Sequence, residues 1–564
     1  MSGSFKLHSQ TEAFWRDEYQ VTDQDLDLVT SLILDAGKPR SADILAAAII
    51  MRRVKREQQA LAQMASRGDL YQPKNTYEVG QRLVFSAREF ADGTVTDVRE
   101  GYNPKYGEFS VIKVQFEDEG PELEFAAGFA YEHALNRPEE ELLGGSDEAF
   151  SVEDLVATCL PYVRDRLSAA LEEHDEFLRF EDEWYLQELL PDVDEGYLNL
   201  AEALIYERDK PLSVSDILSA LDLAEGTSVA AQSFALNRAL ASDARFDDVS
   251  LDDQPLWYLR QLEPTAVHTR PPVMDDPIRT EGGESIGLSM LDLVEDLGDE
   301  LDDVPGMVLR ELDQIAYDVT FPHLYAGTMP STQQLLTALK LEHNDRHARI
   351  TLMDANSGKA YPVWLVPTQG YICGLADWYR EVGMCVGGRV EVSIPDEPLT
   401  IAVSTQRARR SRSEFIRAAA AEGGTLTLQM QRASLDVEVD RDTVIYIPDP
   451  EEIATLMLTD RMRGLSLSEI VYHAFEELAK LGSGGTVHAK SVYSAVNLMR
   501  RCGSVPIFQE LTRRACYDPV GNNEWVFDPN KKGIYYTTPD DMRERPQSSR
   551  DTAVQEPVAQ YLGR

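Results

Sequence analysis

The stretch "SDARFDDVSLDDQPLWYLRQ", residues 242–261, constrains the fold of this chain more than any other. A helical pattern ends, an Arg-Phe pair opens an extended run, an acidic tip interrupts it, and a Trp-Tyr-Leu run closes it. Two extended runs around a polar tip predict a β-hairpin. Phe246 and Trp257 need an apolar partner, and the preceding helices supply one. The pattern therefore predicts a hairpin that closes a small helical core.

Helical patterns precede this hairpin from Tyr197, and "KPLSVSDIL" supplies a proline and then an N-cap at Ser213. Three helices followed by a two-stranded wing make a winged helix-turn-helix, which we predict at 197–262. A related pattern recurs at 461–535, where Trp525 follows a Gly-Asn-Asn tip as Trp257 follows its acidic tip. We predict a second winged helix there.

The rest of the chain divides by changes in periodicity and charge. The fold class expected is a multidomain α+β protein with winged-helix units, a small SH3-like barrel and a β-rich pseudobarrel-like domain. Residues 415–421, "FIRAAAA", are expected to be helical. The remaining segments are a helix-turn-helix-like region without a wing at 10–75, the SH3-like barrel at 76–135, an acidic helical region at 138–196, a linker at 263–288, an acidic helical segment at 289–317, the β-rich domain at 318–405, a basic strip with connecting α/β structure at 406–460, and a disordered tail at 536–564.

The formal charge of −43 argues against DNA wrapped over the whole surface, because a strongly acidic protein repels phosphate. The charge is uneven: residues 138–200 hold 19 acidic and 3 basic side chains, and "DLVEDLGDELDD" at 292–303 holds seven acids and no base. We find no signal peptide, no apolar run long enough to cross a membrane, and five scattered cysteines. These features predict a cytoplasmic protein without membrane contact.

Sequence motifs that would indicate a catalytic, nucleotide-binding or metal-binding site are incomplete in this chain. "GGTVHAKS" at 484–491 nearly spells a phosphate-binding loop, but Ala489 stands where glycine is needed. His343 and His347 are four residues apart and could share a helix face, yet two ligands do not hold zinc. We therefore expect no catalytic, cofactor or metal site and no enzyme activity.

The candidates for nucleic-acid contact lie in the C-terminal part of the chain. A helix at 489–501 would place cationic and amide groups on one face, with Val492, Val496 and Met499 on the other, as a recognition helix requires. An ordinary solvated face is the alternative. A basic strip that could clamp phosphate, or form a disordered linker, precedes residue 415. The DNA-binding candidates are Lys490, Ser494, Asn497 and Arg501 on the helix, and Arg407, Arg409, Arg410 and Arg412 in the strip.

Two resemblances extend these inferences. The unit at 197–262 resembles the HARE-type helix-turn-helix family, to which the delta subunit of bacterial RNA polymerase belongs, through Pro211-Leu212, "DARF" (243–246) and Trp257-Tyr258-Leu259. The segment 345–395, within a domain at about 320–400, looks like a DNA-binding pseudobarrel through "ITLMDANSGKAYPV" and "GLADWYREVGMCVGGRVEVSI". It has Gly387-Gly388 where that family usually has Gly-Asp. Together the two resemblances cover about a quarter of the chain.

The resemblances imply an accessory protein of transcription or of DNA transactions. We therefore expect a non-enzymatic, DNA-binding or transcription-associated protein whose partners are duplex DNA and a basic protein surface such as RNA polymerase. In the middle unit, the helix face with Gln232, Ser233 and Asn237 carries only Arg238 as a charge, which favours protein contact over DNA. The alternative for the whole chain is a protein-interaction scaffold with no nucleic-acid function.

Overall fold

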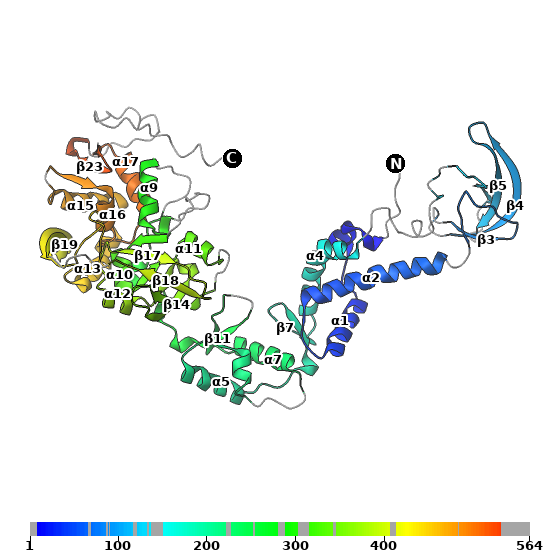
Figure 1. Ribbon diagram of the computed structural model, residues 1–564, viewed down its shortest axis with the longest axis horizontal. Coiled ribbons are helices and arrows are strands. Elements are labelled where there is room, and N and C mark those ends of the chain that lie inside the picture. Colours follow the sequence, from blue (N-terminus) through cyan, green and yellow to red (C-terminus); the bar gives the residue numbers. More distant parts are fainter. Residues whose placement is uncertain are drawn as a thin grey trace. The chain divides into compact units, whose positions relative to one another are not determined.

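The computed structural model shows a mixed α+β protein with several separate sheets, which confirms the predicted class (Figure 1). The chain forms two compact units, residues 1–200 with 214–242, and residues 201–213 with 243–564, and each is described separately. The structure describes residues 8–65, 69–85, 88, 91–116, 121–131, 133, 135–136, 151–221, 227–251, 254–279, 288–302, 315–341, 346–406, 413–482 and 484–531.

One order of elements occurs three times: a helix, a strand of two or three residues, further helices and then a hairpin. We call these the helix–hairpin modules. In each, the short strand pairs with the second arm of the hairpin, and a tryptophan on that arm lies opposite the short strand. The pairs are Trp184 with Arg40, Trp257 with Leu212 and Trp525 with Val487.

The first module has helix α1 (Asp23–Ala36), strand β1 (Arg40–Ser41), helices α2 (Ala42–Ala65) and α4 (Val152–Glu172), and hairpin β7 (Phe177–Phe180) and β8 (Glu183–Leu186). Trp184 is buried in one core with Ile33, Ile49 and Leu167. The expectation of a wingless first unit is therefore wrong, because its hairpin follows only after an inserted domain. The region 138–196, predicted to be helical, therefore contains this hairpin in addition to helix α4. Its residues 138–150 lie outside the described ranges.

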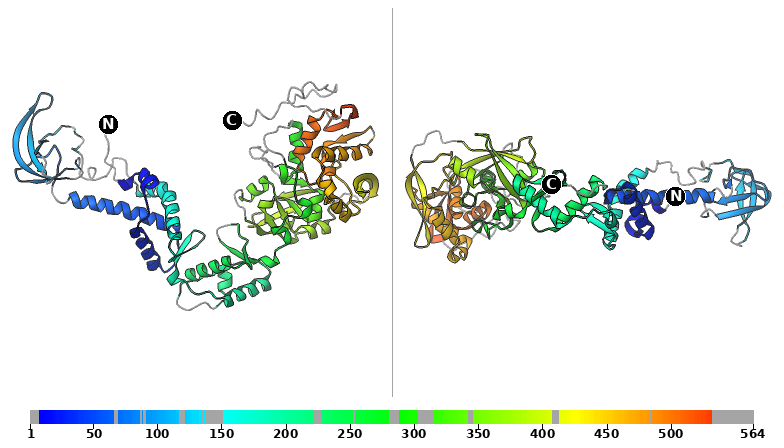
Figure 2. Two further views of the ribbon diagram at one scale, coloured as in Figure 1. Left: turned by 180° about the vertical axis from the view of Figure 1, so that it is seen from behind. Right: turned by 90° about the horizontal axis from the view of Figure 1, so that it is seen from below.

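The inserted domain is a five-stranded sheet of β2 (Asp69–Leu70), β3 (Arg82–Phe85), β4 (Ala91–Asn103), β5 (Gly107–Phe116) and β6 (Leu123–Ala127), in that order. The sheet is barrel-like around an aromatic cluster, in which Phe85 lies 4.6 Å from both Tyr71 and Phe125, centroid to centroid. The β4–β5 ribbon extends beyond the other strands of this sheet (Figure 1; Figure 2, left). Gly93 on β4 packs closely against β5, and a Cβ there would meet Val114 at 2.4 Å.

Helices α6 (Val214–Leu218) and α7 (Val229–Ser242) belong to the same compact unit as the first module. The ring of Phe234 on α7 lies 5.7 Å from Tyr185 and 6.3 Å from Phe180, both on the first hairpin. Ser228, which precedes α7, donates a hydrogen bond to the carbonyl of Gly37 at 2.7 Å. The apolar side of α7 therefore packs on the hairpin of the first module.

The second compact unit begins with α5 (Glu195–Arg208, from Ala201 on) and β9 (Leu212–Ser213), and resumes with hairpin β10 (Phe246–Asp248) and β11 (Leu256–Leu259). Phe246 and Trp257 are both buried, as the sequence predicts for a hairpin that closes a core. Tyr258 on β11 contacts the following domain through Trp364, with ring centroids 5.6 Å apart.

Residues 263–279 are ordered, so the prediction of a linker at 263–288 is wrong for this part; 280–287 lie outside the described ranges. Helix α8 (Thr265–His268) forms here, and Val267, Val273 and Met274 are buried. Ile278 forms a β-bridge with Cys502. Apolar residues between the prolines hold this segment against the domain, which the Pro/Gly-rich composition does not reveal.

The following domain contains a seven-stranded sheet in the order β12, β17, β18, β14, β15, β16, β13. All neighbours are antiparallel except β14 and β18. Trp378 and Leu352 are among its fully buried core residues. The elements are α9 (Leu288–Leu297), β12 (Ile315–Asp318), α10 (Phe321–Ala326), β13 (Thr328–Pro330), α11 (Gln333–Ala338), β14 (Ala348–Asp354), β15 (Ala360–Val366), β16 (Tyr371–Cys373), α12 (Ala376–Val382), β17 (Arg389–Ser393) and β18 (Thr400–Ser404).

The "FIRAAAA" run forms strand β19 (Glu414–Glu422), paired along its length with β20 (Thr425–Ala433), so the predicted helix is wrong. Gly423 and Gly424, both with positive φ, form the tight turn that returns the chain and favours pairing over a helix. Helices α13 (Pro450–Met457) and α14 (Asp460–Arg463) follow.

The third module consists of α15 (Leu467–Ala479), β21 (Thr486–His488), α16 (Ala489–Val496), α17 (Ser504–Arg513), β22 (Tyr517–Gly521) and β23 (Glu524–Phe527). Ser466 caps α15 in a reciprocal capping box with Glu469, as a Ser with Glu three residues on predicts. The helix expected at 489–501 ends at Val496, and the predicted tail 536–564 lies outside the described residues.

We expect Trp184→Ala to destabilise the first module by about 3–5 kcal/mol, because it removes a large, fully buried side chain. Hydrogen exchange followed by mass spectrometry should speed up in α2, α4 and the 177–186 hairpin together. Tyr102→Ala, at a ring that is 72% exposed, is the control and should leave exchange there unchanged. Faster exchange in the hairpin alone would show that the hairpin is not part of the module's core.

Candidate functional site

The four predicted DNA-binding residues of the third module are buried. Exposed fractions are 5% for Lys490, 2% for Ser494, 0% for Asn497 and 1% for Arg501. The prediction that this face is exposed is therefore wrong. The physical reason is that residues 296–302 and 440–443 lie against it and satisfy its polar groups, as the contacts below describe.

Arg501 lies at the centre of this contact. Its guanidinium makes a bidentate pair with Asp299, at 2.7 Å from Nη1 to Oδ2 and 2.5 Å from Nη2 to Oδ1, and also donates to Glu300 Oε1 at 2.9 Å. The other Glu300 oxygen lies 3.1 Å from Nε2 of His323. Since both acids and the arginine are at most 5% exposed at their side chains, the ions are neutralised inside the protein.

The other three residues have similar intrachain partners. Lys490 contacts both Asp296 and Asp440, the latter at 2.8 Å from Nζ to Oδ2. The Ser494 hydroxyl donates to the carbonyl of Thr443. The Asn497 amide donates to the carbonyl of Cys502 at 3.0 Å and also accepts from Arg501. Lys490 and Ser494 lie on α16, whereas Asn497 and Arg501 follow its end at Val496, and all four side chains are buried.

The pKa shifts follow from this burial. Burial opposes ionisation of Glu300, but the adjacent Arg501 and His323 hold its pKa below the ordinary value. Asp302 has no cationic partner, and burial together with Asp299 raises its pKa to about 7. It accepts hydrogen bonds from the backbone N–H groups of Ser504 at 2.7 Å and Val505 at 3.0 Å, at the start of α17. An acid at a helix N-terminus is a favourable arrangement.

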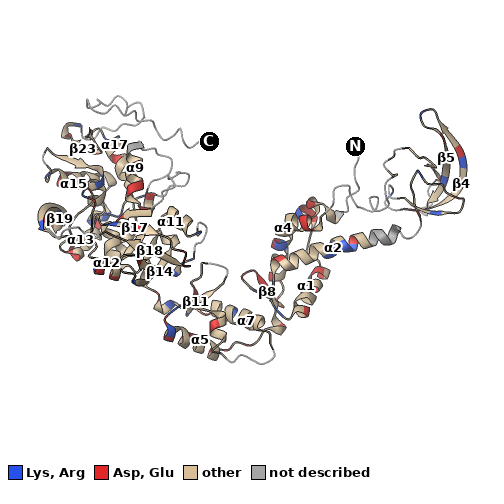
Figure 3. Ribbon diagram, viewed as in Figure 1, with Lys and Arg blue, Asp and Glu red and all other residues tan. Residues whose placement is uncertain are grey.

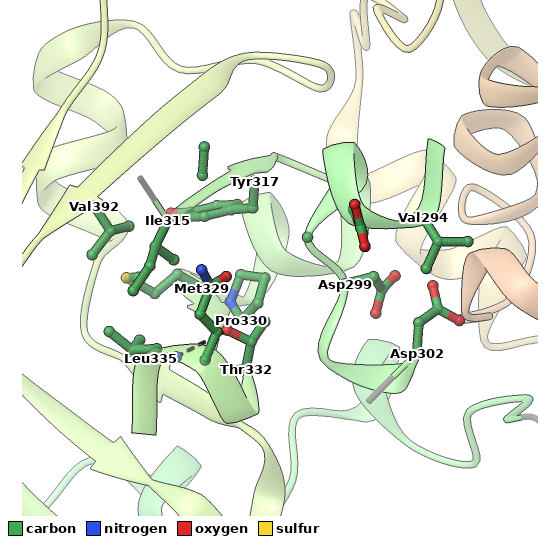
Figure 4. Close-up of a pocket in the computed structure, with 14 residues that line it drawn as sticks. Val294, Asp299, Asp302, Ile315, Tyr317, Met329, Pro330, Thr332, Leu335 and Val392 are labelled. Atoms are coloured by element: carbon green, nitrogen blue, oxygen red, sulfur yellow. Dashed lines mark hydrogen bonds between the residues drawn. The ribbon is translucent and has the colours of Figure 1, made fainter. Parts of the chain in front are cut away.

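A small cavity of about 40 Å³ adjoins Asp299 and Asp302. Figure 4 shows these two carboxylates on one side and the apolar Ile315, Met329 and Leu335 on the other. This volume accommodates only a few water molecules. The cavity is therefore a packing feature of the charged junction.

A larger, open groove of about 340 Å³ lies beside the same junction. Five carboxylates line it, from Asp296, Asp318, Glu391, Glu438 and Asp440, together with Arg389, Thr405, Gln406 and Val439. We call it the acidic groove. Arg389 pairs with Asp318 at 2.8 Å and with Asp296 at 2.9 Å, while Lys490 reaches Asp296 and Asp440 from the third module. Among the described residues, two cations contact the groove against its five acids, which favours a negative potential.

Within the groove, the acids differ in their affinity for protons. Burial raises the pKa of Asp318 to about 6, although Arg389 opposes the shift. Burial would also raise the pKa of Asp440, but the hydrogen bond from Lys490 and that from the Asp442 backbone bring it below the ordinary value. Asp318 is the innermost acid, with a side chain only 1% exposed, while Asp296 is 44% exposed. The outer carboxylates are therefore the ones that a ligand reaches.

The predicted basic strip at Arg407, Arg409, Arg410 and Arg412 lies outside the described residues. A further basic cluster lies on α2, where Arg52, Lys55 and Arg56 are exposed (Figure 3). Arg56 donates to the side chain of Gln24 at 2.5 Å. On α7, Gln232, Ser233, Asn237 and Arg238 are half-buried.

Comparisons with protein-family models, curated proteins and solved structures find no match to this chain. In the described ranges, no helix combines the length and the apolar character that crossing a lipid bilayer requires.

The sequence analysis missed the acids that cover the predicted face. It predicted an acidic helical segment at 289–317, where Leu293, Val294 and Leu297 recur at helical spacing, but did not pair its acids with residues 489–501. A second missed signal is the repeat of Lys-Pro-x-Ser before Asp-Ile-Leu, at 38–45 and again at 210–218. This repeat marks the short strand and second helix of the first two modules, and predicts that the first also needs a hairpin.

We expect Arg501→Met to destabilise the second compact unit by about 3–5 kcal/mol, because it leaves Asp299 and Glu300 buried without a cation. Thermal unfolding at pH 7 measures the loss. The difference in unfolding free energy between the two chains should become smaller as pH falls. In the variant, protonation neutralises the buried acids that have lost their cation. In the natural chain the pKa of Glu300 is depressed, so acid removes stability instead.

The matched control is Arg380→Met, because Arg380 is 74% exposed and its ion-pair partner among the described residues is the exposed Asp377. It should change the melting temperature by less than about 2 °C, as surface pairs contribute little. Equal effects of the two substitutions would show that the buried network does not hold the unit together.

Proposed function

We propose that this chain is a non-enzymatic interaction protein in which the helix–hairpin modules are winged helices used for packing, and the acidic groove binds a cationic segment of a protein partner. One observation carries the proposal: Lys490 and Arg501 are neutralised by acids of the same chain, while the groove beside them keeps accessible carboxylates. The third winged helix therefore supports the groove instead of contacting duplex DNA through α16.

The chemistry of the groove favours a lysine or arginine side chain as the bound group. Carboxylates at the rim attract cations at long range and accept charge-assisted hydrogen bonds at short range. The groove volume lies within the range of ligand pockets. A basic protein surface, such as one on RNA polymerase, has the required charge.

A second candidate function, duplex-DNA binding, is favoured by the cluster on α2. Arg52, Lys55 and Arg56 are exposed at spacings of three and four residues, which places them on one side of the helix. Neutralisation of phosphates by such a cluster gives binding that weakens steeply with salt. This function requires neither α16 nor the acidic groove.

The test of the groove uses the full chain and a fluorescent octa-arginine peptide, with binding followed by anisotropy at about 0.1 M salt. We expect Glu391→Gln/Glu438→Gln to weaken binding at least about tenfold, because the pair removes two of the five groove carboxylates. The matched control is Asp396→Asn/Glu397→Gln, which removes two exposed charges from the same domain. The control should weaken binding less than about twofold. Equal losses in both variants would reduce the interaction to general charge attraction and contradict the proposal.

The test of DNA binding is a salt titration of the full chain with a fluorescent duplex of about 20 base pairs. If α2 neutralises two or three phosphates, the slope of log K against log[salt] should be about −2 to −3. Lys55→Glu/Arg56→Glu should abolish binding. The acidic-groove variant should leave it unchanged. The absence of binding at low salt would exclude this second function.

A further inference from the structure

We propose that Asp247, Glu263, His268 and His347 form a binding site for a divalent transition metal, with zinc as the best match. Asp247, Glu263 and His268 each offer a ligand atom within 4.8 Å of the others. His347 Nε2 lies 3.5 Å from Glu263 Oε2 and 3.6 Å from Asp247 Oδ2. Two imidazoles and two carboxylates are a donor set that zinc accepts.

The two distances from His347 agree with tetrahedral coordination, and the exposed His268 side chain must move to bring all four ligand atoms around one ion. Zinc bonds of about 2.0–2.1 Å to nitrogen and oxygen place the ligand atoms of a tetrahedron about 3.3–3.4 Å apart. The two distances from His347 are close to this value. The distance from His268 Nε2 to Glu263 Oε2 is shorter, at 2.6 Å, and a small rotation of the half-exposed His268 ring would lengthen it.

The hydrogen bonding of the buried Glu263 carboxylate also points to a bound cation, independently of the spacing of the ligand atoms. The Glu263 side chain is fully buried, and its Oε2 lies 2.6 Å from His268 Nε2 and 3.5 Å from His347 Nε2, but neither carboxylate oxygen accepts a well-oriented hydrogen bond. His268 and His347 approach Oε2 without the orientation that a donated hydrogen bond needs, and Nε2 of His347 also lacks a hydrogen-bond partner. A buried carboxylate without such partners is costly. A cation bonded to Glu263 and to both ring nitrogens would satisfy all of these atoms together.

One contact competes with the metal. Arg260 Nη2 lies 2.9 Å from Asp247 Oδ2. The Arg260 side chain is 54% exposed, so it can turn into solvent when Asp247 binds a cation. Glu263 and the two histidines therefore form the core of the site, and Asp247 completes it.

The site would join three parts of the second compact unit. Asp247 lies on β10 of the hairpin. Glu263 lies just before α8, and His268 is the last residue of α8. His347 directly precedes β14 of the seven-stranded sheet. The same junction contains the tilted ring contact of Tyr258 with Trp364 and a pair of Arg346 with Asp248 at 2.7 Å. A metal ion here would fix the hairpin to the β-rich domain, as structural zinc sites do.

The experiment uses the full chain, stripped of metal with a chelator and then titrated with zinc chloride against a chromophoric zinc indicator. We expect one zinc per chain, with a dissociation constant below about 1 µM. His268→Gln and His347→Gln should each weaken binding at least about thirtyfold. The control, His174→Gln, removes an exposed histidine elsewhere in the chain and should leave binding unchanged.

Cobalt(II) provides a second readout that does not depend on affinity alone. Tetrahedral Co²⁺ gives strong visible absorption, which the natural chain and His174→Gln should show and His268→Gln should lack. Because His268 Nε2 lies 2.6 Å from the buried Glu263, the melting temperature of each metal-free variant is measured beside the absorption, and His268→Gln should stay folded while it lacks the cobalt signal. The absence of a tight zinc site in the natural chain, or equal binding by all variants, would overturn the proposal.

Discussion

The buried ion network around Arg501 is the interaction on which the second compact unit depends. A guanidinium and two carboxylates leave water together, which is favourable only when each group finds partners with good geometry. Arg501 achieves this through Asp299 and Glu300, and His323 holds the second oxygen of Glu300. Because these residues are about 200 and 180 positions from Arg501 in sequence, the network fixes the third module to the segment before the seven-stranded sheet.

The three modules show one construction serving different contacts. In each, a buried tryptophan on the last strand lies opposite the short first strand. The remaining surface of the module is then available for other contacts. Tyr185 of the first module contacts Phe234 on α7, Tyr258 of the second contacts Trp364, and α16 of the third contacts the acids of 296–302. Their observed contacts are thus with other parts of the same chain, and this use underlies the proposal of winged helices as packing units.

Negative charge in this protein has two distinct roles. Buried acids such as Asp299 have specific partners and stabilise the fold. Acids at the rim of the groove are accessible and available to a ligand, and the proposed metal site combines both situations in one cluster. The formal charge of −43 does not distinguish these roles, since it counts a buried, paired carboxylate and an exposed one equally.

The sequence by itself determined the local elements that depend on neighbouring residues: the Ser466 cap, the hairpin closed by Trp257 and the turn-bounded strands of the barrel. It also identified Lys490, Ser494, Asn497 and Arg501 as one face. Only the tertiary structure decided that this face is buried, that the first module regains a hairpin after the inserted barrel, and that "FIRAAAA" is a strand. The physical reason is that burial and strand pairing depend on partners far away in the chain. Helical periodicity specifies which residues share a side, but the acids that cover that side are specified some two hundred residues earlier.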